Sequence, residues 1–107
     1  MMDIATNKAE QVAVMARELE RAEPELRAFI ADMNEDEQAE LVAILWIGRG
    51  SFEVEEFAEA VATARDERST PTEEYLLATP NLAYDIEAGL EALGVDVTAL
   101  AEEVMGR

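Results

Sequence analysis

The stretch Gln38–Gly50 constrains the fold of this chain more than any other. From Leu41 to Ile47 it holds six larger apolar residues, interrupted only by Ala43, and it includes Trp46, the single tryptophan of the sequence. A surface helix keeps a polar face, so a helix that is apolar all round must be covered on most of its sides. As a helix, this stretch would be the centre of a bundle. A short apolar run is equally compatible with a buried strand, and the flanking residues decide between the two.

These flanks indicate a helix. Asn34 is followed three residues later by Glu37, which is the pattern of an N-terminal capping box, and the acids between them suit the positive end of a helix dipole. At the other end, Gly48 and Gly50 can supply the left-handed residue that stops a helix. We therefore predict a helix from about residue 35 to 48.

Further helices are predicted from apolar residues spaced three and four apart and from start and stop signals. The expected ranges are 6–22, 24–33, 52–67, a short segment after residue 71, 80–93 and about 97–104. Their expected starts are Pro24, Ser51, the pairs Thr70-Pro71 and Thr79-Pro80, and Asp96, with Gly94 ending the helix at 80–93. The stripe expected to be buried at 52–67 is Val54, Phe57, Ala58 and Val61. No stretch alternates like a strand.

The fold class that follows is all-α, a compact bundle of six or seven helices around the central apolar helix at about 35–48. At 107 residues the chain is long enough for one hydrophobic core, and no linker divides it, so we expect a single domain over 1–107 with a loose end at 1–5. Half of the residues are hydrophobic, which excludes a disordered chain.

The residue types that are missing exclude several kinds of chemistry. The chain has no cysteine and no histidine. Disulfides, thiol nucleophiles, histidine bases, and zinc or haem sites with such ligands are therefore excluded. Oxygen ligands remain, and they suit magnesium, calcium or manganese. We expect no cofactor, with magnesium as the alternative.

The net charge of −17 bears on partners. It argues against binding to the nucleic-acid backbone and to anionic membranes, and it favours basic partners or cations. No apolar run approaches 18 residues and no signal peptide is evident, so we expect a cytoplasmic protein without a transmembrane helix. The acidity has two interpretations, a genome composition adapted to salt and a specific basic partner.

Two stretches carry a resemblance to a known family. They are MNEDEQAELVAILWIGRGSFEVEEFAEA (33–60) and EYLLATPNLAYDIEAGLEALG (74–94). The shared features are an acid-rich cap, a helix ending in W-x-G-R-G, an aromatic-bearing helix, Y-L-L-x-x-P and a late Gly-Leu. With these features the chain resembles the small bacterial proteins grouped as domain of unknown function 3775. Ser51 stands where aspartate is expected, and Phe57 where tryptophan is common. The resemblance implies a helical fold and a bacterial origin, and it implies no activity.

The residues that stand out by motif are Trp46, Gly48, Arg49, Gly50, Tyr75 and Pro80, and each also has a structural interpretation as a core aromatic, a turn or a helix start. The candidates for contact with a ligand or partner are Trp46, Gly48, Arg49, Gly50, Tyr75 and Tyr84. Arg49 is interpreted either as a cation at a helix C-terminus or as a clamp for an anion, with the glycines letting a ligand approach the backbone. No phosphate-binding loop pattern is present.

Four acids form the alternative, enzymatic hypothesis. Glu37 and Glu40 are three residues apart on one helix, and Glu53 and Glu56 repeat the spacing on the next. The arrangement loosely resembles that of all-α nucleotide pyrophosphatases, in which such acids hold magnesium against a polyphosphate. With 25 acids in 107 residues such pairs also arise by chance, and solvent-facing acids are the simpler interpretation.

The leading functional hypothesis is a protein-interaction or self-associating module, with a protein partner or a homodimer. A helical bundle can bind a partner segment in a groove between helices. The side chains that could line such a groove are Met15, Met33, Met105, Trp46, Phe52, Tyr75 and Tyr84, and the simpler interpretation of each is an ordinary core position. Tyr84 lies off the stripe of its helix, which suggests a second covered face or a dimer interface. The alternatives are a carboxylate–magnesium enzyme and an anion or small-ligand binder at Gly48-Arg49-Gly50.

Overall fold

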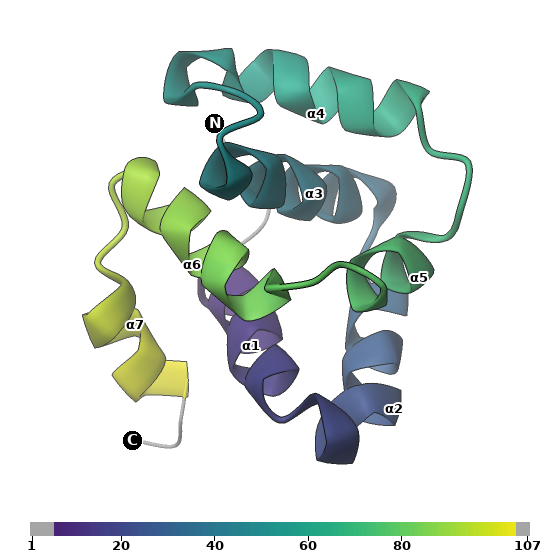
Figure 1. Cartoon of the computed structure of the whole chain (residues 1–107), viewed down its shortest axis with the longest axis vertical. Helices are drawn as coiled ribbons and strands as arrows, with labels where there is room; N and C mark the ends of the chain where they lie inside the picture. Colours follow the sequence, from purple (N-terminus) through teal and green to yellow (C-terminus); the bar gives the residue numbers. More distant parts are fainter. Residues whose placement is uncertain (1–5, 105–107) are drawn as a thin grey trace.

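A computed structural model describes residues 6–104, and all regular structure in that range is helical. The elements are α1 (Thr6–Arg17), α2 (Leu19–Ala31), α3 (Glu35–Arg49), the 3-10 turn η1 (Val54–Glu56), α4 (Phe57–Asp66), α5 (Thr72–Leu77), α6 (Leu82–Ala92) and α7 (Val97–Val104) (Figure 1). The predicted all-α bundle is confirmed. None of the described helices is both long enough and apolar enough to cross a membrane. The loose end expected at residues 1–5 lies outside the described range.

Helix α3 is the centre of the bundle, as predicted. It lies between α4 on one side and α6 on the other (Figure 1). At its start the side chain of Asn34 accepts a hydrogen bond from the Glu37 N–H at 2.8 Å, and Glu37 Oε1 accepts one from the Asn34 N–H at 3.1 Å. At its end Gly50 has a φ of 85°, which is the left-handed stop. The capping box and the stop were both predictable because each is a local property of the chain.

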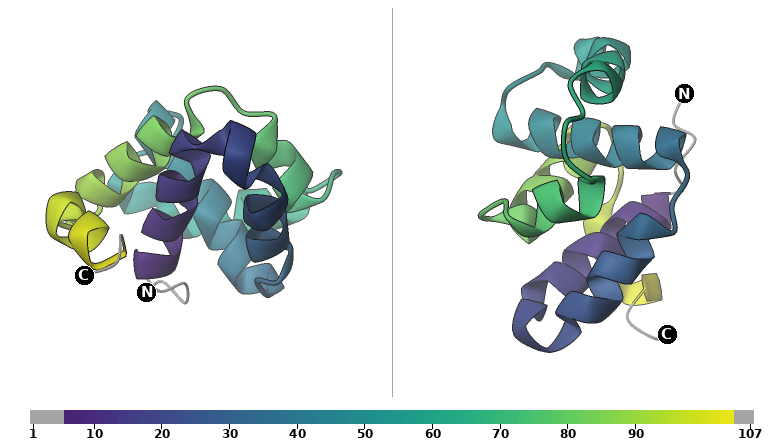
Figure 2. Two further views of the ribbon diagram at one scale, coloured as in Figure 1. Left: turned by 90° about the horizontal axis from the view of Figure 1, so that it is seen from below. Right: turned by 90° about the vertical axis from the view of Figure 1, so that its right-hand side faces the viewer.

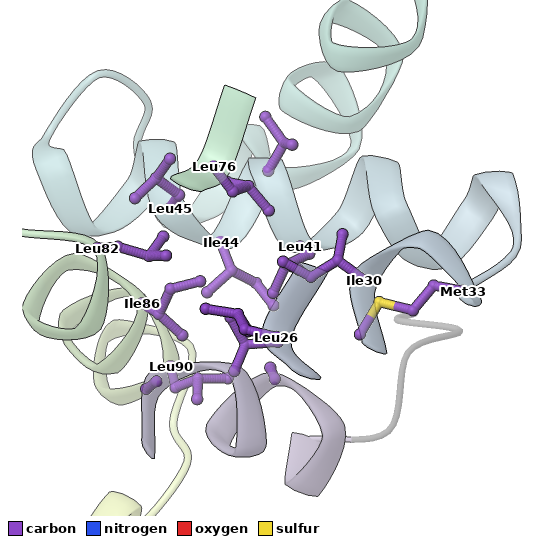
Figure 3. Close-up of a cluster of buried hydrophobic side chains, with 14 of the residues drawn as sticks. Leu26, Ile30, Met33, Leu41, Ile44, Leu45, Leu76, Leu82, Ile86 and Leu90 are labelled. Atoms are coloured by element: carbon purple, nitrogen blue, oxygen red, sulfur yellow. The ribbon is translucent and has the colours of Figure 1, made fainter. Parts of the chain in front are cut away.

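The hydrophobic core lies between α3 and the helices α1, α2, α5 and α6, each of which contributes buried side chains to it. Figure 2 shows α1 and α2 folded back on one another, and α1 also packs on α6 and α7. The largest fully buried apolar side chains are Leu26, Ile30, Leu41, Ile44, Leu45, Leu76, Ile86 and Leu90 (Figure 3). Burial of one such side chain contributes about 1.5–3 kcal/mol. The core therefore depends on residues from almost the whole described chain.

The boundary between the first two helices was predicted wrongly. It was expected at Glu23-Pro24, whereas the chain breaks at Glu18, whose φ of −116° and ψ of 43° are not helical, and Pro24 lies inside α2. The break at Glu18 allows α1 and α2 to pack against each other. Tertiary packing has here overridden the local preference of proline for a helix start.

The start and the buried face of α4 also differ from the prediction. Glu53, not Ser51, begins this segment, because its N–H donates to Glu56 Oε1 at 2.8 Å. The Ser51 N–H instead donates to the Trp46 carbonyl at 2.9 Å and so closes α3. The buried residues of α4 are Ala60 and Ala64, whereas Val54 and Ala58 are exposed and Phe57 and Val61 are half-buried. Small residues on the buried face allow α4 to lie close to α3.

At the expected starts Thr70-Pro71 and Thr79-Pro80, where a threonine would cap the helix, neither threonine does so. No side chain caps α5, which is preceded by Pro71, or α6, which is preceded by Asn81 with a φ of 60°. The Thr79 hydroxyl instead donates to the Tyr75 carbonyl at 2.9 Å and so closes α5. The end of the chain follows the prediction: Gly94 has a φ of 95°, and Asp96 Oδ1 accepts a hydrogen bond from the Ala99 N–H at 3.2 Å.

Candidate functional site

An aromatic cluster lies on the side of α3 that faces α4 and α5. The Trp46 Nε1–H donates to the Tyr75 hydroxyl oxygen at 3.0 Å. The Phe52 ring stacks on Trp46 with ring centroids 5.7 Å apart and planes inclined by 21°. Trp46 and Tyr75, which sequence motifs indicated separately, are therefore brought into direct contact by the fold. The hydrogen bond fixes the orientation of both rings.

Beside this cluster lies a groove bounded by α3, α4, the connection after α4, and α5. One hollow of about 270 Å³ is lined by the aromatic wall of Trp46 and Tyr75 and by the apolar floor of Val42 and Ala64. A second hollow of about 320 Å³ adjoins it and extends to Glu35. The two hollows share Val42, Ala64, Arg68 and Thr72. We call this combined surface the α3–α4 groove.

The polar groups of the α3–α4 groove differ in how they are engaged. Arg65 forms an ion pair with Asp36. Arg68 is exposed and forms no ion pair with another described side chain. The acids Glu35 and Glu67 are exposed at the rim. The groove therefore offers an apolar centre, one arginine without an acid among the described side chains, and acidic edges.

The Gly48-Arg49-Gly50 turn does not contribute to this groove. Arg49 is exposed and lines neither hollow. Gly50 is the stop of α3, whereas Gly48 remains helical and lies against the backbone of α6. A Cβ on Gly48 would lie 1.8 Å from the Asp85 carbonyl oxygen. The prediction that Gly48 shares the role of a helix stop is wrong, because this glycine instead permits close packing of two helices.

The four acids of the magnesium hypothesis are not gathered at one point. Glu37 binds Lys8 at 2.7 Å and caps α3, and Glu56 caps the segment that begins at Glu53. The Lys8 ammonium and the Asn34 N–H lower the pKa of Glu37. Glu40 is buried. Among the side chains that the structure describes, those of residues 6–18 and 23–100, no group of three or more histidine, cysteine, aspartate or glutamate residues could hold a metal ion.

Sequence reasoning missed a carboxyl pair between α1 and α6. Glu10 is fully buried, and its neighbour Glu87 forms an ion pair with Arg17. Burial, followed by the hydrogen bond and charge of Glu87, raises the pKa of Glu10 to about 8. The only signal was that Glu10 falls on the same turn as Ala9 and Ala13, which are also buried.

The second exposed region of interest surrounds Tyr84. Its side chain is 72% exposed, in keeping with its position off the apolar stripe of α6. An open hollow of about 760 Å³ lies beside it, between the end of α1 and the α5–α6 connection, and its lining includes Arg17, Pro80 and Glu87. A dimer interface at Tyr84 stays a prediction.

The fold and the groove define an all-α bundle built on one central helix, with a partly aromatic groove on its surface. Residues 23–95 match the family described as protein of unknown function (DUF3775). The chain belongs to this family, which confirms the resemblance found in the sequence. No curated protein and no solved structure matches the chain.

Proposed function

We propose that this protein is an interaction module whose α3–α4 groove binds a segment of a basic partner protein. The observation that carries the proposal is the pair of adjoining hollows with an apolar floor and a wall formed by Trp46 and Tyr75. Large aromatic side chains supply much of the binding energy at protein interfaces. The hollow at Trp46 would receive one apolar side chain of the partner, and the second hollow would receive the chain beside it.

The aromatic wall is prepared for binding. Because the Trp46 N–H is already bonded to the Tyr75 hydroxyl, covering it with an apolar partner leaves no donor unsatisfied. The Tyr75 hydroxyl accepts this bond and keeps its own hydrogen for a carbonyl of the partner. A wall held in one conformation also reduces the conformational entropy that is lost on binding.

Charge supports a basic partner over a second copy of the chain. The net charge is −17, and the exposed acids near the groove include Glu35 at one end and Glu67 at the rim. The neighbouring segment at 53–59 adds Glu53, Glu55, Glu56 and Glu59, all exposed. Opposite charge accelerates encounter and favours the correct partner, whereas two copies of this chain repel each other.

A cytoplasmic location and a bacterial origin, expected from the sequence, stay predictions.

The test is selection from a displayed library of random peptides, followed by titration of the selected peptides. We expect the selected sequences to carry a net positive charge and one large apolar residue. Trp46 is the only tryptophan, so its indole N–H gives a single NMR signal, and this signal should shift on binding.

A matched pair of variants localises the binding site. Ser69 is exposed and lines the hollow at Trp46, so Ser69→Phe should fill the hollow and weaken binding at least about tenfold, which is a loss of about 1.4 kcal/mol. Thr98 is exposed on α7, so Thr98→Phe should leave binding unchanged. Equal binding by both variants, or selected peptides that are acidic, would contradict the proposal.

A further inference from the structure

We infer that Glu10 of α1 and Glu87 of α6 share one proton, and that this shared proton holds α1 against α6. The inference is independent of the α3–α4 groove. The carboxyl pair makes the contact between α1 and α6 sensitive to pH.

The geometry is that of a buried acid facing a partly buried one. The Glu10 side chain is fully buried, and neither of its carboxyl oxygens receives a hydrogen bond from a donor group in the described residues. Helices α1 and α6 pack directly on one another. Glu87, on α6, is 17% exposed at its side chain and forms an ion pair with Arg17.

One proton bound between the two carboxyl groups removes the repulsion between them and supplies the missing hydrogen bond. Two carboxylates in contact repel each other when both are ionised, and a buried carboxylate without a donor is unfavourable. With one proton, the Glu10 O–H donates to Glu87, which also accepts the bond from Arg17. Burial acts against ionisation of Glu87, but the bonds from Glu10 and Arg17 outweigh it and lower the pKa of Glu87. Glu10 is therefore the neutral partner at pH 7.

Of the other charged side chains that the structure describes around this contact, none forms an ion pair with Glu10. On α1, Lys8 binds Glu37 of α3, and on α2, Arg27 binds Glu23 and Glu74. The remaining described charges of α1, α2 and α6 and of the residues next to them are acids: Glu18, Glu25, Asp32, Asp85, Glu91 and Asp96. Helix α3, which packs on α6, adds the acids Glu35, Asp36 and Glu40 and, at its end, the exposed Arg49. The described side chains of α7, residues 97–100, carry no ionisable group. Among the described side chains, Arg17 is the cation that lowers the pKa values of both members of the pair.

The consequence is a contact that weakens as the pH rises. The folded protein holds the Glu10 proton up to about pH 8, whereas an unfolded chain releases it at its ordinary value of 4.5. The folded state thus binds more protons between these values, and stability falls as the pH rises through them. Arg17 and Glu87 also line the hollow beside Tyr84. Loosening of α1 from α6 would therefore change the shape of this hollow.

The direct test is carboxyl-carbon NMR of the full chain between pH 3 and 10. We expect the Glu10 carbon to titrate near pH 8, and α1 amides to exchange with solvent faster above that value, beyond the intrinsic rise of exchange rate with pH. Titration of Glu10 near pH 4.5 would overturn the inference, whatever the stability of substituted variants.

Two substitutions supply the second test. Glu10→Gln keeps a donor towards Glu87 and removes the titration, so its unfolding midpoint should stay nearly constant between pH 5 and 9, where the midpoint of the original protein falls. Glu91→Gln, an exposed position on the same α6, should leave the fall in place. An equal fall for Glu10→Gln and the original chain would overturn the inference.

Discussion

Gly48 of α3 lies against the carbonyl oxygen of Asp85 in α6, so closely that a Cβ on Gly48 would approach that oxygen to 1.8 Å. The contact is reciprocal, because a Cβ on Gly89 of α6 would lie 2.0 Å from the carbonyl oxygen of Ile44 in α3. In each helix the glycine and the contacted residue are four positions apart, which is about one turn. Two glycines thus allow the central helix and α6 to cross with their backbones in contact.

We predict that Gly48→Ala and Gly89→Ala each lower the free energy of unfolding by about 3 kcal/mol or more. The reason is that the new methyl group meets backbone, which cannot rotate away as a side chain would. Denaturant unfolding of purified variants measures the effect.

Gly50→Ala is the matched control for this pair. Its φ of 85° disfavours a side chain, but nothing lies within 4 Å of the Cβ position. The expected cost is only that of the left-handed conformation, about 1–2 kcal/mol. If Gly50→Ala were as damaging as Gly48→Ala, the close crossing would not be the reason that Gly48 is required.

The contrast between Gly50 and Gly48 marks what the sequence could predict. The stop at Gly50 and the Asn34–Glu37 capping box depend on neighbours along the chain, and both were predicted. The contact of Gly48 with Asp85 joins residues 37 positions apart (85 − 48), and no local pattern indicates it. The break at Glu18 was missed for the same reason, because the packing of α1 on α2 places it.

The Trp46–Tyr75 hydrogen bond gives a second prediction. Tyr75→Phe removes the acceptor of the Trp46 N–H in a half-buried position and should cost about 1 kcal/mol. The single indole N–H signal should also move and exchange faster with solvent. Tyr84→Phe is the control: because Tyr84 is 72% exposed, neither stability nor the indole signal should change. An unchanged indole signal in Tyr75→Phe would show that the bond does not form in solution.

The acid limb of the stability profile gives a third prediction. The pKa of Glu37 is lowered by Lys8 and by the Asn34 N–H, so its contribution is present above pH 4.5 and is lost as the pH falls through the lowered value. Glu37→Gln should therefore flatten the decline of stability below pH 4.5. Asn34→Ala should cost about 1 kcal/mol at neutral pH, as expected for the loss of an N-cap. A Glu37→Gln variant with an unchanged acid limb would contradict the prediction.

Some residues of the candidate site were predicted from the sequence, but the contacts between them were not. Trp46 and Tyr75 were both indicated by motifs, but their hydrogen bond and the groove beside them depend on how α5 is placed against α3. Arg68, which lines both hollows, lies in a polar connection that carries no pattern. Glu10 was missed because an acid beside small residues is ordinarily solvated, whereas the packing of other helices on α1 buries it beside Glu87 of α6.

The net charge of −17 gives the last prediction, which concerns salt. Repulsion among like charges opposes the compact state, and salt screens it over about 10 Å at 0.1 M. The unfolding midpoint should rise when sodium chloride is increased from about 10 mM to about 200 mM.

Glu55 and Glu59 are exposed and form no ion pair with another described residue, so changing both to glutamine should raise the midpoint at low salt. This gain should shrink at high salt, where the repulsion is already screened. A gain of equal size at both salt concentrations would mean that the substitutions act through local helix preference and not through charge.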